Sequence, residues 1–176
     1  MSAADAERLL GLLREHGQTL ATAESLTGGL IGELLTDVPG ASRSYLGGLI
    51  TYATRLKSSL AGVDQQTLDR LGPVAGLTAQ QMATGVANRC AADWGLSVTG
   101  VAGPDEQDGH PVGQVYVGVA RPGEGYHQVL ELRLTGSRQE IRRQAADRAL
   151  ELLTEALGMR LLPDRVEDKE SPRRGP

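Results

Sequence analysis

The chain has 176 residues and a formal net charge of −4 at pH 7, from 18 Lys and Arg residues against 22 Asp and Glu residues. This length fits one domain, and the 40% of hydrophobic residues excludes a largely disordered chain. The acidic balance argues against non-specific nucleic-acid binding, which depends on clustered Lys and Arg. Cys90 is the one cysteine, so an intrachain disulfide and a cysteine-rich zinc site are excluded.

Nothing in the sequence predicts export or membrane insertion. Residues 1–18 carry charges throughout and lack the apolar core of a signal peptide. No apolar run approaches the roughly 20 residues that a membrane span requires. We therefore expect a soluble, cytoplasmic protein with no membrane partner and no nucleic-acid partner.

Helices and strands alternate over the first half of the chain, because the hydrophobic spacing switches between the helical and the strand period. The expected elements are a helix over residues 3–16, a strand over 19–23, a helix from residue 30, a strand over 45–53, and short helices over 55–61 and 64–71. Asp64 is the expected N-cap of the last of these. Thr78 and Gln81 predict a capping box that opens a further helix ending near Asp93.

The second half of the chain predicts a hairpin and the longest helix. Its expected elements are a strand over residues 96–99, a Gly-rich loop over 100–113, hairpin strands over 114–120 and 127–134, and a helix over 137–157 capped by Ser137. Helix–strand alternation followed by a hairpin predicts a single three-layer α/β/α domain with a mixed β-sheet. We expect this domain to span residues 1–162 and a disordered polar tail to span residues 163–176.

Ser25 lies where a strand is expected to end and a helix to begin, in the segment Ala-Glu-Ser-Leu-Thr-Gly-Gly. Helix-start amides at such a turn can bind an anion or form an oxyanion hole. Ser is also a favoured N-cap residue, so a purely structural role stays open. Lys57 falls about one turn into the helix that follows the strand ending near Tyr52. A partly desolvated Lys can act as the general base for a Ser, and an exposed helix Lys is the ordinary alternative.

Two further segments are candidates for ligand contact. Thr99, Gly100 and Gly103 form a strand end and Gly-bearing loop that is typical of a ligand cradle or of a simple turn. Arg138 and Arg142 lie one helical turn apart, where they suit a phosphate or pair with surface acids. Three scattered His residues without spaced carboxylates argue against a metal centre.

Five motifs occur in a fixed order along the chain. They are the segment at residues 23–29, Tyr52 with Lys57 and the Ala-Gly-Val end at 61–63, Thr-Gly-x-Ala-Gly-Pro at 99–104, Pro-Val-Gly-x-Val at 111–115 and Gly-x-Arg-x-x-Ile-Arg at 136–142. Together they resemble the CinA C-terminal domain family, whose active members are nicotinamide mononucleotide amidohydrolases. The resemblance covers about residues 3–157 and implies the fold of that family in its stand-alone form.

The resemblance also implies a reaction, namely metal-independent and cofactor-free hydrolysis of the carboxamide of nicotinamide mononucleotide to nicotinate mononucleotide and ammonia, in pyridine-nucleotide recycling. Ser25 is similar to the family's nucleophile and Lys57 to the residue that takes its proton. Tyr52 and Thr99 are similar to supporting hydroxyls in that network. The implied substrate contacts are Thr27, Gly28, Gly29, Gly100, Gly103, Arg138 and Arg142, with Arg142 expected to face the nucleotide. A homodimer or higher homo-oligomer is also implied.

The sequence departs most from the family pattern in residues 105–110. Glu106, Gln107 and His110 stand where the family has Gly-Gly and a Lys. Acidic residues in this loop would weaken binding of an anionic phosphate. Two alternatives therefore stay open, a catalytically silent nucleotide-binding or interaction domain on the same scaffold, and an amidohydrolase for a different small amide.

Overall fold

The computed structural model describes residues 3–161, so the expected polar tail over residues 163–176 lies outside the described residues. The helices are α1 (Ala3–Glu15), α2 (Leu30–Thr36), α3 (Thr54–Ser59), α4 (Gln65–Leu71), α5 (Gly76–Cys90) and α6 (Arg138–Leu161), with short 3-10 turns η1 (Ala41–Arg43) and η2 (Pro122–Glu124). The strands are β1 (Leu20–Glu24), β2 (Tyr45–Ile50), β3 (Trp94–Gly100), β4 (Gln114–Arg121) and β5 (Tyr126–Arg133). Each expected helix and strand is confirmed, with bounds that differ by a few residues.

The five strands form one mixed sheet in the order β2-β1-β3-β4-β5. β1 pairs in parallel with β2 and β3, whereas β4 is antiparallel to both β3 and β5. In the parallel part, Glu24 of β1 is in register with Ile50 and with Val98. The carboxyl ends of β1, β2 and β3 therefore meet at one edge of the sheet, and β1 is the strand at which the chain order reverses.

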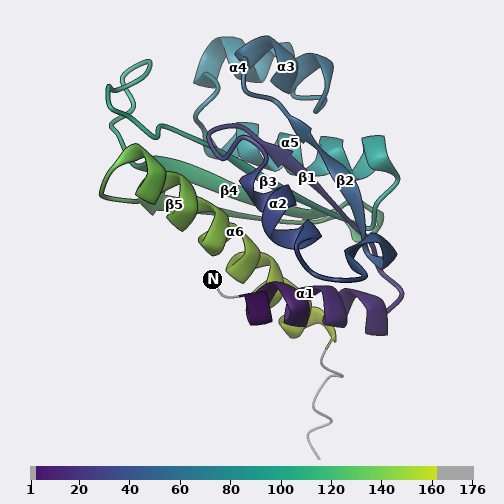
Figure 1. Cartoon of the computed structure of the whole chain (residues 1–176). Helices are drawn as coiled ribbons and strands as arrows, with labels where there is room; N and C mark the ends of the chain where they lie inside the picture. The colour runs from purple at the N-terminus through teal and green to yellow at the C-terminus, as the bar shows by residue number, and fades with distance from the viewer. Residues whose placement is uncertain (1–2, 162–176) are drawn as a thin grey trace, which may run out of the picture.

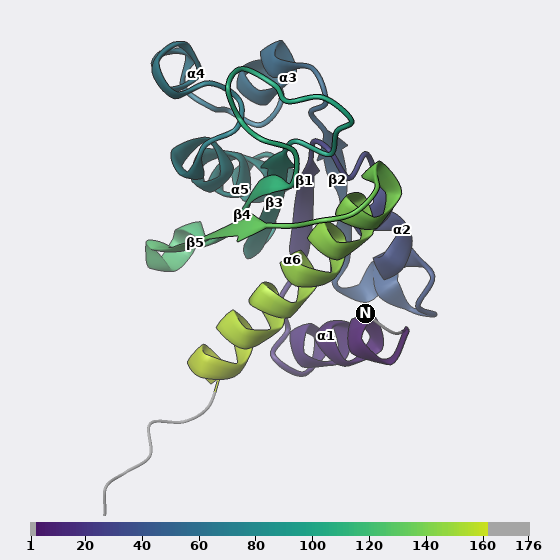
Figure 2. The ribbon, with the colours of Figure 1, turned by 90° about the vertical axis from the view of Figure 1, so that its left-hand side faces the viewer.

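Helices cover both faces of the sheet and produce three layers (Figure 1). Helices α3, α4 and α5 lie on one side, and α1, α2 and α6 lie on the other, a separation that Figure 2 shows from a second direction. The period-2 alternation of β1 explains this, because Leu20 packs into the core under α1 and α6 while Ala21 and Ala23 pack with Met82 of α5. The predicted three-layer α/β/α fold with a mixed sheet is confirmed.

The long terminal helix α6 buries a stripe of apolar residues in the core. Its buried positions include Ile141, Ala145, Ala149, Leu152, Leu153 and Ala156. Ser137 caps α6 as expected, since the backbone N–H of Glu140 donates to Ser137 Oγ at 3.4 Å and the Ser137 amide donates to the Glu140 carboxylate at 2.7 Å. This capping fixes the first turn of α6, which carries Arg138.

The capping box predicted at Thr78 is wrong. Helix α5 begins at Gly76, so Thr78 already lies in its first turn and its hydroxyl donates to the carbonyl of Gly72 at 2.8 Å. Gln81 instead pairs with Asp64, whose backbone N–H donates to Gln81 Oε1 and whose carboxylate accepts from Gln81 Nε2. Asp64 is the N-cap residue of α4 by position, but its side chain makes no capping hydrogen bond. The pairing of Asp64 with Gln81, which joins α4 to α5, therefore stands in place of the two helix caps expected at Asp64 and at Thr78.

Candidate active site

The polar residues singled out in the sequence meet at the carboxyl edge of the parallel strands. Ser25 follows β1, Tyr52 follows β2 and Thr99 lies near the end of β3. In open α/β sheets this edge, at the point where strand order reverses, is the usual ligand site. A cavity of about 470 Å³ opens there and is lined by Ser25, Leu26, Tyr52, Lys57, Thr99, Gly100, Gly103, Asp105, Glu106, Gln107 and Arg138, among others.

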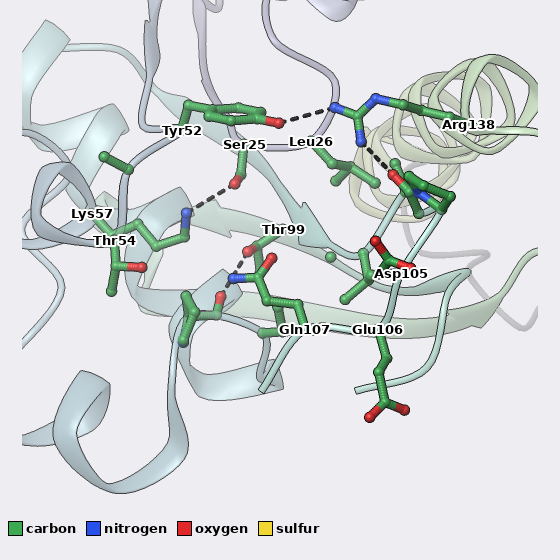
Figure 3. Close-up of a pocket in the computed structure, with 18 residues that line it drawn as sticks. Ser25, Leu26, Tyr52, Thr54, Lys57, Thr99, Asp105, Glu106, Gln107 and Arg138 are labelled. Atoms are coloured by element: carbon green, nitrogen blue, oxygen red, sulfur yellow. Dashed lines mark hydrogen bonds between the residues drawn. The ribbon is translucent and has the colours of Figure 1, made fainter. Parts of the chain in front are cut away.

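Ser25 and Lys57 face one another across the floor of this cavity (Figure 3). Lys57 Nζ donates a 2.9 Å hydrogen bond to Ser25 Oγ and a 2.8 Å hydrogen bond to the carbonyl of Thr51. The Lys57 side chain comes from the short helix α3 and is only 1% exposed. Burial penalises its charged form and lowers the pKa of the Lys57 ammonium to about 8. The exposed-Lys alternative is thereby excluded.

Glu24, the last residue of β1, shapes the turn that carries Ser25. Its buried carboxylate accepts hydrogen bonds from the backbone N–H groups of Gly29, Ile31 and Gly32, at 3.0, 3.1 and 2.9 Å. The first amides of α2 are therefore occupied by this carboxylate, and the oxyanion hole expected from helix-start amides is not available there. The N-cap position belongs to Gly29, so the N-cap alternative for Ser25 is wrong.

Two consecutive glycines allow this tight turn. Gly28 has φ +61 and Gly29 has φ +102, values that residues with a Cβ adopt at a cost. Thr27, Gly28 and Gly29 were expected to contact substrate, but they lie outside the residues that line the cavity. Their place in the structure is behind Ser25, where they bend the chain from β1 into α2.

The two arginines of α6 differ in position from what the sequence predicted. Arg142 was expected to face the nucleotide, but Nε and a terminal nitrogen of its guanidinium donate to the carbonyls of Leu26 and Thr27 at 2.9 and 2.7 Å. Among the described residues, the arginine that lines the cavity is Arg138. Arg138 therefore lies at the cavity rim, whereas Arg142, one helical turn further along α6, binds the backbone carbonyls of the turn that follows Ser25.

Arg138 bridges two sides of the cavity mouth (Figure 3). Its guanidinium donates to the carbonyl of Gly103 at 2.8 Å and to the hydroxyl of Tyr52 at 2.9 Å. Both partners are neutral, so the positive charge of Arg138 is not compensated by them. Tyr52 is 59% exposed and belongs to this bridge rather than to the Ser25–Lys57 hydrogen bond.

Thr99 lines the cavity, but its hydroxyl is committed elsewhere. The buried Thr99 Oγ1 donates to the carbonyl of Pro73 at 2.7 Å, which joins β3 to the segment before α5. The sequence implied a supporting hydroxyl in the network of Ser25 and Lys57, and the structure gives Thr99 no hydrogen bond to either of them. Gly100 and Gly103, which continue from Thr99, line the cavity.

The loop after β3 forms the acidic wall of the cavity. At its base Val101 N–H donates to Gln114 O and Gly113 N–H donates to Val101 O, and at its tip Gln107 and His110 exchange two backbone hydrogen bonds. The loop is therefore closed at both ends. Between these ends, Asp105, Glu106 and Gln107 line the cavity, and we call the two carboxylate residues, Asp105 and Glu106, the acidic wall.

Three contributors to the site were missed in the sequence. Glu24 was quoted within a motif without a role, although a carboxylate at the end of a buried strand needs partners and could have been flagged. The Thr51 carbonyl and the Gly103 carbonyl are backbone atoms, for which the sequence carries no signal. In the part of the chain that the structure describes, no group of three His, Cys, Asp or Glu residues could hold a metal ion. Nor, within residues 3–161, is any helix long and apolar enough to cross a membrane.

Comparison with known proteins agrees with this architecture. The family model of the CinA C-terminal domain matches residues 3–157. A CinA-like protein of Acidobacterium capsulatum is 46% identical over 150 residues, which are 85% of this chain and 36% of that protein. One of Frankia casuarinae is 46% identical over 149 residues, covering 85% of this chain and 34% of that protein. The chain thus spans about a third of the length of these curated relatives.

Solved structures show the same fold. The competence/damage inducible protein CihA from Agrobacterium tumefaciens is 36% identical, with a TM-score of 0.84 over 89% of this chain and 94% of that chain. A CinA superfamily protein from Klebsiella pneumoniae is 28% identical, with a TM-score of 0.85 over 89% of this chain and 98% of that chain. By sequence match over nearly all of the described residues, and by fold, the chain belongs to the CinA C-terminal domain family.

Proposed function

We propose that this protein hydrolyses the carboxamide of nicotinamide mononucleotide to nicotinate mononucleotide and ammonia, with Ser25 as nucleophile and Lys57 as general base. The observation that carries the proposal is the 2.9 Å hydrogen bond between Lys57 Nζ and Ser25 Oγ at the floor of a cavity. A Ser hydroxyl is a weak nucleophile until a base removes its proton. A Lys serves as that base when burial brings its pKa towards neutrality, which is the condition of Lys57.

The first half of the reaction would form an acyl-enzyme. Neutral Lys57 accepts the proton of Ser25, and Ser25 Oγ forms a bond to the amide carbon while the carbonyl electrons move to oxygen. The tetrahedral intermediate collapses when the protonated Lys57 gives its proton to the amide nitrogen, and the C–N bond breaks to release ammonia. With a pKa of about 8, roughly one Lys57 in ten is neutral at pH 7.

The second half would hydrolyse the ester of Ser25. Lys57, neutral again, takes a proton from a water molecule, whose oxygen attacks the acyl carbon. Collapse of the second tetrahedral intermediate returns the proton to Ser25 Oγ and releases the carboxylic acid, which ionises to nicotinate mononucleotide. The sum is one amide and one water converted to one acid and one ammonia, so the balance closes with Ser25 and Lys57 alone.

The cavity suits an amide with a larger attached group. Its volume of about 470 Å³ falls in the ordinary range of small-molecule sites. Arg138 supplies a cation at the rim, and its two hydrogen-bond partners are neutral oxygens. A phosphate placed there would meet an uncompensated guanidinium, which is a favoured phosphate ligand.

A second candidate, an amidohydrolase for a different small amide, is favoured by the acidic wall. Asp105 and Glu106 line the same cavity as Arg138, so its carboxylates outnumber its guanidinium. Once Lys57 is neutral, as the base must be, the net charge of these groups is negative. A phosphate would be repelled by the wall, whereas an amide with an uncharged or cationic remainder would not.

The test is to incubate the purified chain with nicotinamide mononucleotide and to follow ammonia and nicotinate mononucleotide. We expect turnover that Ser25→Ala and Lys57→Met each reduce by at least about a thousandfold, while Ser58→Ala on the same helix as Lys57 leaves it unchanged. Turnover retained in Ser25→Ala would overturn the mechanism. If the wild type releases ammonia only from amides that lack a phosphate, the second candidate replaces the first.

A further inference from the structure

Two consecutive backbone N–H groups beside the nucleophile have no hydrogen-bond partner. Leu26 is 4% exposed and Thr27 is 0% exposed, and within residues 3–161 nothing accepts a hydrogen bond from either backbone N–H. The buried hydroxyl of Thr27 is also without a partner among the described residues. Buried N–H groups in folded proteins are nearly always paired. Of these two residues Leu26 lines the cavity beside Ser25, so its unpaired N–H is a donor next to the oxygen that would attack a substrate carbonyl.

The neighbouring amides show that the two unpaired donors are a local exception. Gly28 N–H donates to the Ser25 carbonyl at 3.1 Å, and the amides of Gly29, Ile31 and Gly32 donate to Glu24. Every other amide from the turn into the first residues of α2 that could bind an anion is thus occupied. The Glu24 carboxylate occupies the helix-start amides at which the sequence suggested an anion site. The two N–H groups that remain unpaired, those of Leu26 and Thr27, are nearer to Ser25 in the chain.

The carbonyls on this turn explain how the two N–H groups are held. In a planar trans peptide the C=O and the N–H point in opposite directions. Arg142 holds the carbonyl of Leu26, so the N–H of Thr27 in the same peptide is directed away from α6. The Ser25 carbonyl is held by Gly28, so the N–H of Leu26 is fixed opposite to it. Leu26 itself lines the cavity next to Ser25.

We propose that the backbone N–H of Leu26 forms the oxyanion site of the reaction, and that Arg142 is a positioning residue that fixes this turn through the carbonyls of Leu26 and Thr27. The inference rests on the proposed function. When the bond from Ser25 Oγ to the amide carbon forms, the carbonyl electrons move onto oxygen and the proton passes to Lys57. The oxyanion then accepts the hydrogen bond from the Leu26 N–H, which strengthens as its charge develops.

This assignment gives Arg142 a signature that a phosphate ligand would not have. A phosphate-binding arginine contributes to ground-state binding, so its loss raises KM. A positioning arginine acts on a site that is used in the transition state, so its loss lowers kcat and leaves KM for the nucleotide unchanged. Its loss also weakens an inhibitor that forms a tetrahedral anion on Ser25, such as pyridine-3-boronic acid.

The experiment compares Arg142→Gln and Arg142→Lys with the control Arg143→Gln, whose parent side chain is 47% exposed and pairs with Asp147 one turn along α6. We expect Arg142→Gln to lower kcat about ten- to a hundredfold, to leave KM within about twofold, and to weaken pyridine-3-boronic acid by the same factor as kcat. Arg142→Lys, which keeps one donor, falls between wild type and Arg142→Gln, and Arg143→Gln matches wild type. Thermal unfolding identifies any variant that fails to fold. If Arg142→Gln fails to fold, kcat, KM and boronate affinity are compared between Arg142→Lys and the wild type.

The outcomes separate the two proposals. A raised KM with kcat retained, or unchanged boronate affinity in a folded Arg142 variant, would overturn the oxyanion assignment and leave the amidohydrolase standing. If the wild type does not hydrolyse nicotinamide mononucleotide but binds the boronate through Ser25, and Arg142→Gln weakens that binding, the substrate is wrong and the oxyanion site holds. A wild type that shows neither turnover nor Ser25-dependent boronate binding would overturn both.

Discussion

Lys57 Nζ lies 2.9 Å from Ser25 Oγ, although 32 positions of sequence separate the two residues. The parallel pairing of β1 with β2 brings them together, since each residue follows the carboxyl end of its strand. The ammonium is buried, and its other hydrogen bond is to the neutral carbonyl of Thr51. An amine in this setting is destabilised in its charged form, and several measurable properties follow from that.

The rate of hydrolysis should rise with pH through the titration of Lys57. The base must be neutral to accept the Ser25 proton, and burial lowers its pKa to about 8. We therefore expect kcat/KM for the amide to increase about tenfold for each pH unit below 7.5 and to level off above about pH 8.5. Steady-state rates between pH 6 and pH 10 give this profile. A rate that is flat over this range would contradict the role of Lys57 as base.

Lys57→Met should make the protein more stable while removing its activity. A pKa lowered from 10.5 to about 8 corresponds to roughly 3 kcal/mol of destabilisation of the native state at neutral pH. The variant also loses the two hydrogen bonds of Lys57, to Ser25 and to Thr51, and each loss cancels about 1 kcal/mol of the gained stability. We expect a net gain of about 1 kcal/mol in the free energy of unfolding at pH 7, measured in urea.

The gain should shrink as the pH rises. Below about pH 8 the native chain carries the full penalty of a buried ammonium. Between about pH 8 and pH 10.5 the unfolded chain still binds a proton that the native chain has released, so wild-type stability increases and approaches that of the variant. Ser25→Ala keeps Lys57 and should retain the wild-type pH dependence. An equal gain at pH 7 and at pH 10 would show that Lys57 is not strained by burial.

Thr99→Val should cost stability without moving the pH midpoint of catalysis. Its hydroxyl satisfies the Pro73 carbonyl at 2.7 Å, and a buried carbonyl left unpaired costs about 1–3 kcal/mol. Ser97→Ala is a matched control, because its hydroxyl donates to the carbonyl of Ala79 at 2.6 Å and Ser97 lies outside the cavity lining. The free energy of unfolding and the pH–rate profile are measured for both. A shifted midpoint in Thr99→Val alone would place Thr99 in the Ser25–Lys57 network after all.

Asp105→Asn and Glu106→Gln should each improve use of the phosphorylated substrate. Each removes one negative charge from the cavity wall, and a charge pair at about 4 Å in water is worth roughly 1 kcal/mol. We expect kcat/KM for nicotinamide mononucleotide to rise about two- to fivefold at low salt, through KM, and the gain to fade at high salt because the loop is exposed. Asp108→Asn, from the same loop but outside the cavity lining, should have little effect. If Asp108→Asn raised kcat/KM as much as the other two variants, the cause would be the net charge of the protein and not the position of the carboxylates in the cavity wall.

Much of the architecture could be predicted because local signals agree with the tertiary fold. The spacing of Leu residues in α1 carries a clear helical period, the Pro-Gly turn at residues 122–125 separates β4 from β5, and the buried apolar residues of α6 recur at three- and four-residue intervals. The capping box at Thr78 failed where a local pattern competed with a tertiary contact. Gln81 is drawn to Asp64 across α4 and α5, and no local rule contains that partner.

The site was predicted by residue type more successfully than by contact. Ser25, Lys57, Tyr52 and Arg138 do line one cavity. Which arginine of α6 reaches the rim depends on how the helix is rotated and where it begins, because Arg138 and Arg142 lie on nearly the same helical face. The occupation of the helix-start amides by Glu24 depends on a buried carboxylate whose partners are backbone atoms. Such contacts exist only once the sheet and both helix layers are assembled.

The burial of Lys57 has a consequence for the life of the protein outside its native state. In an unfolded or half-assembled chain Lys57 is in water, its amine stays protonated at neutral pH, and Ser25 is an ordinary alcohol. The pair becomes reactive only when β1 and β2 are aligned and α3 has closed over them. During synthesis, or after partial unfolding, the chain therefore exposes no activated nucleophile to the other amides and esters of the cell, and its reactivity begins and ends with its fold.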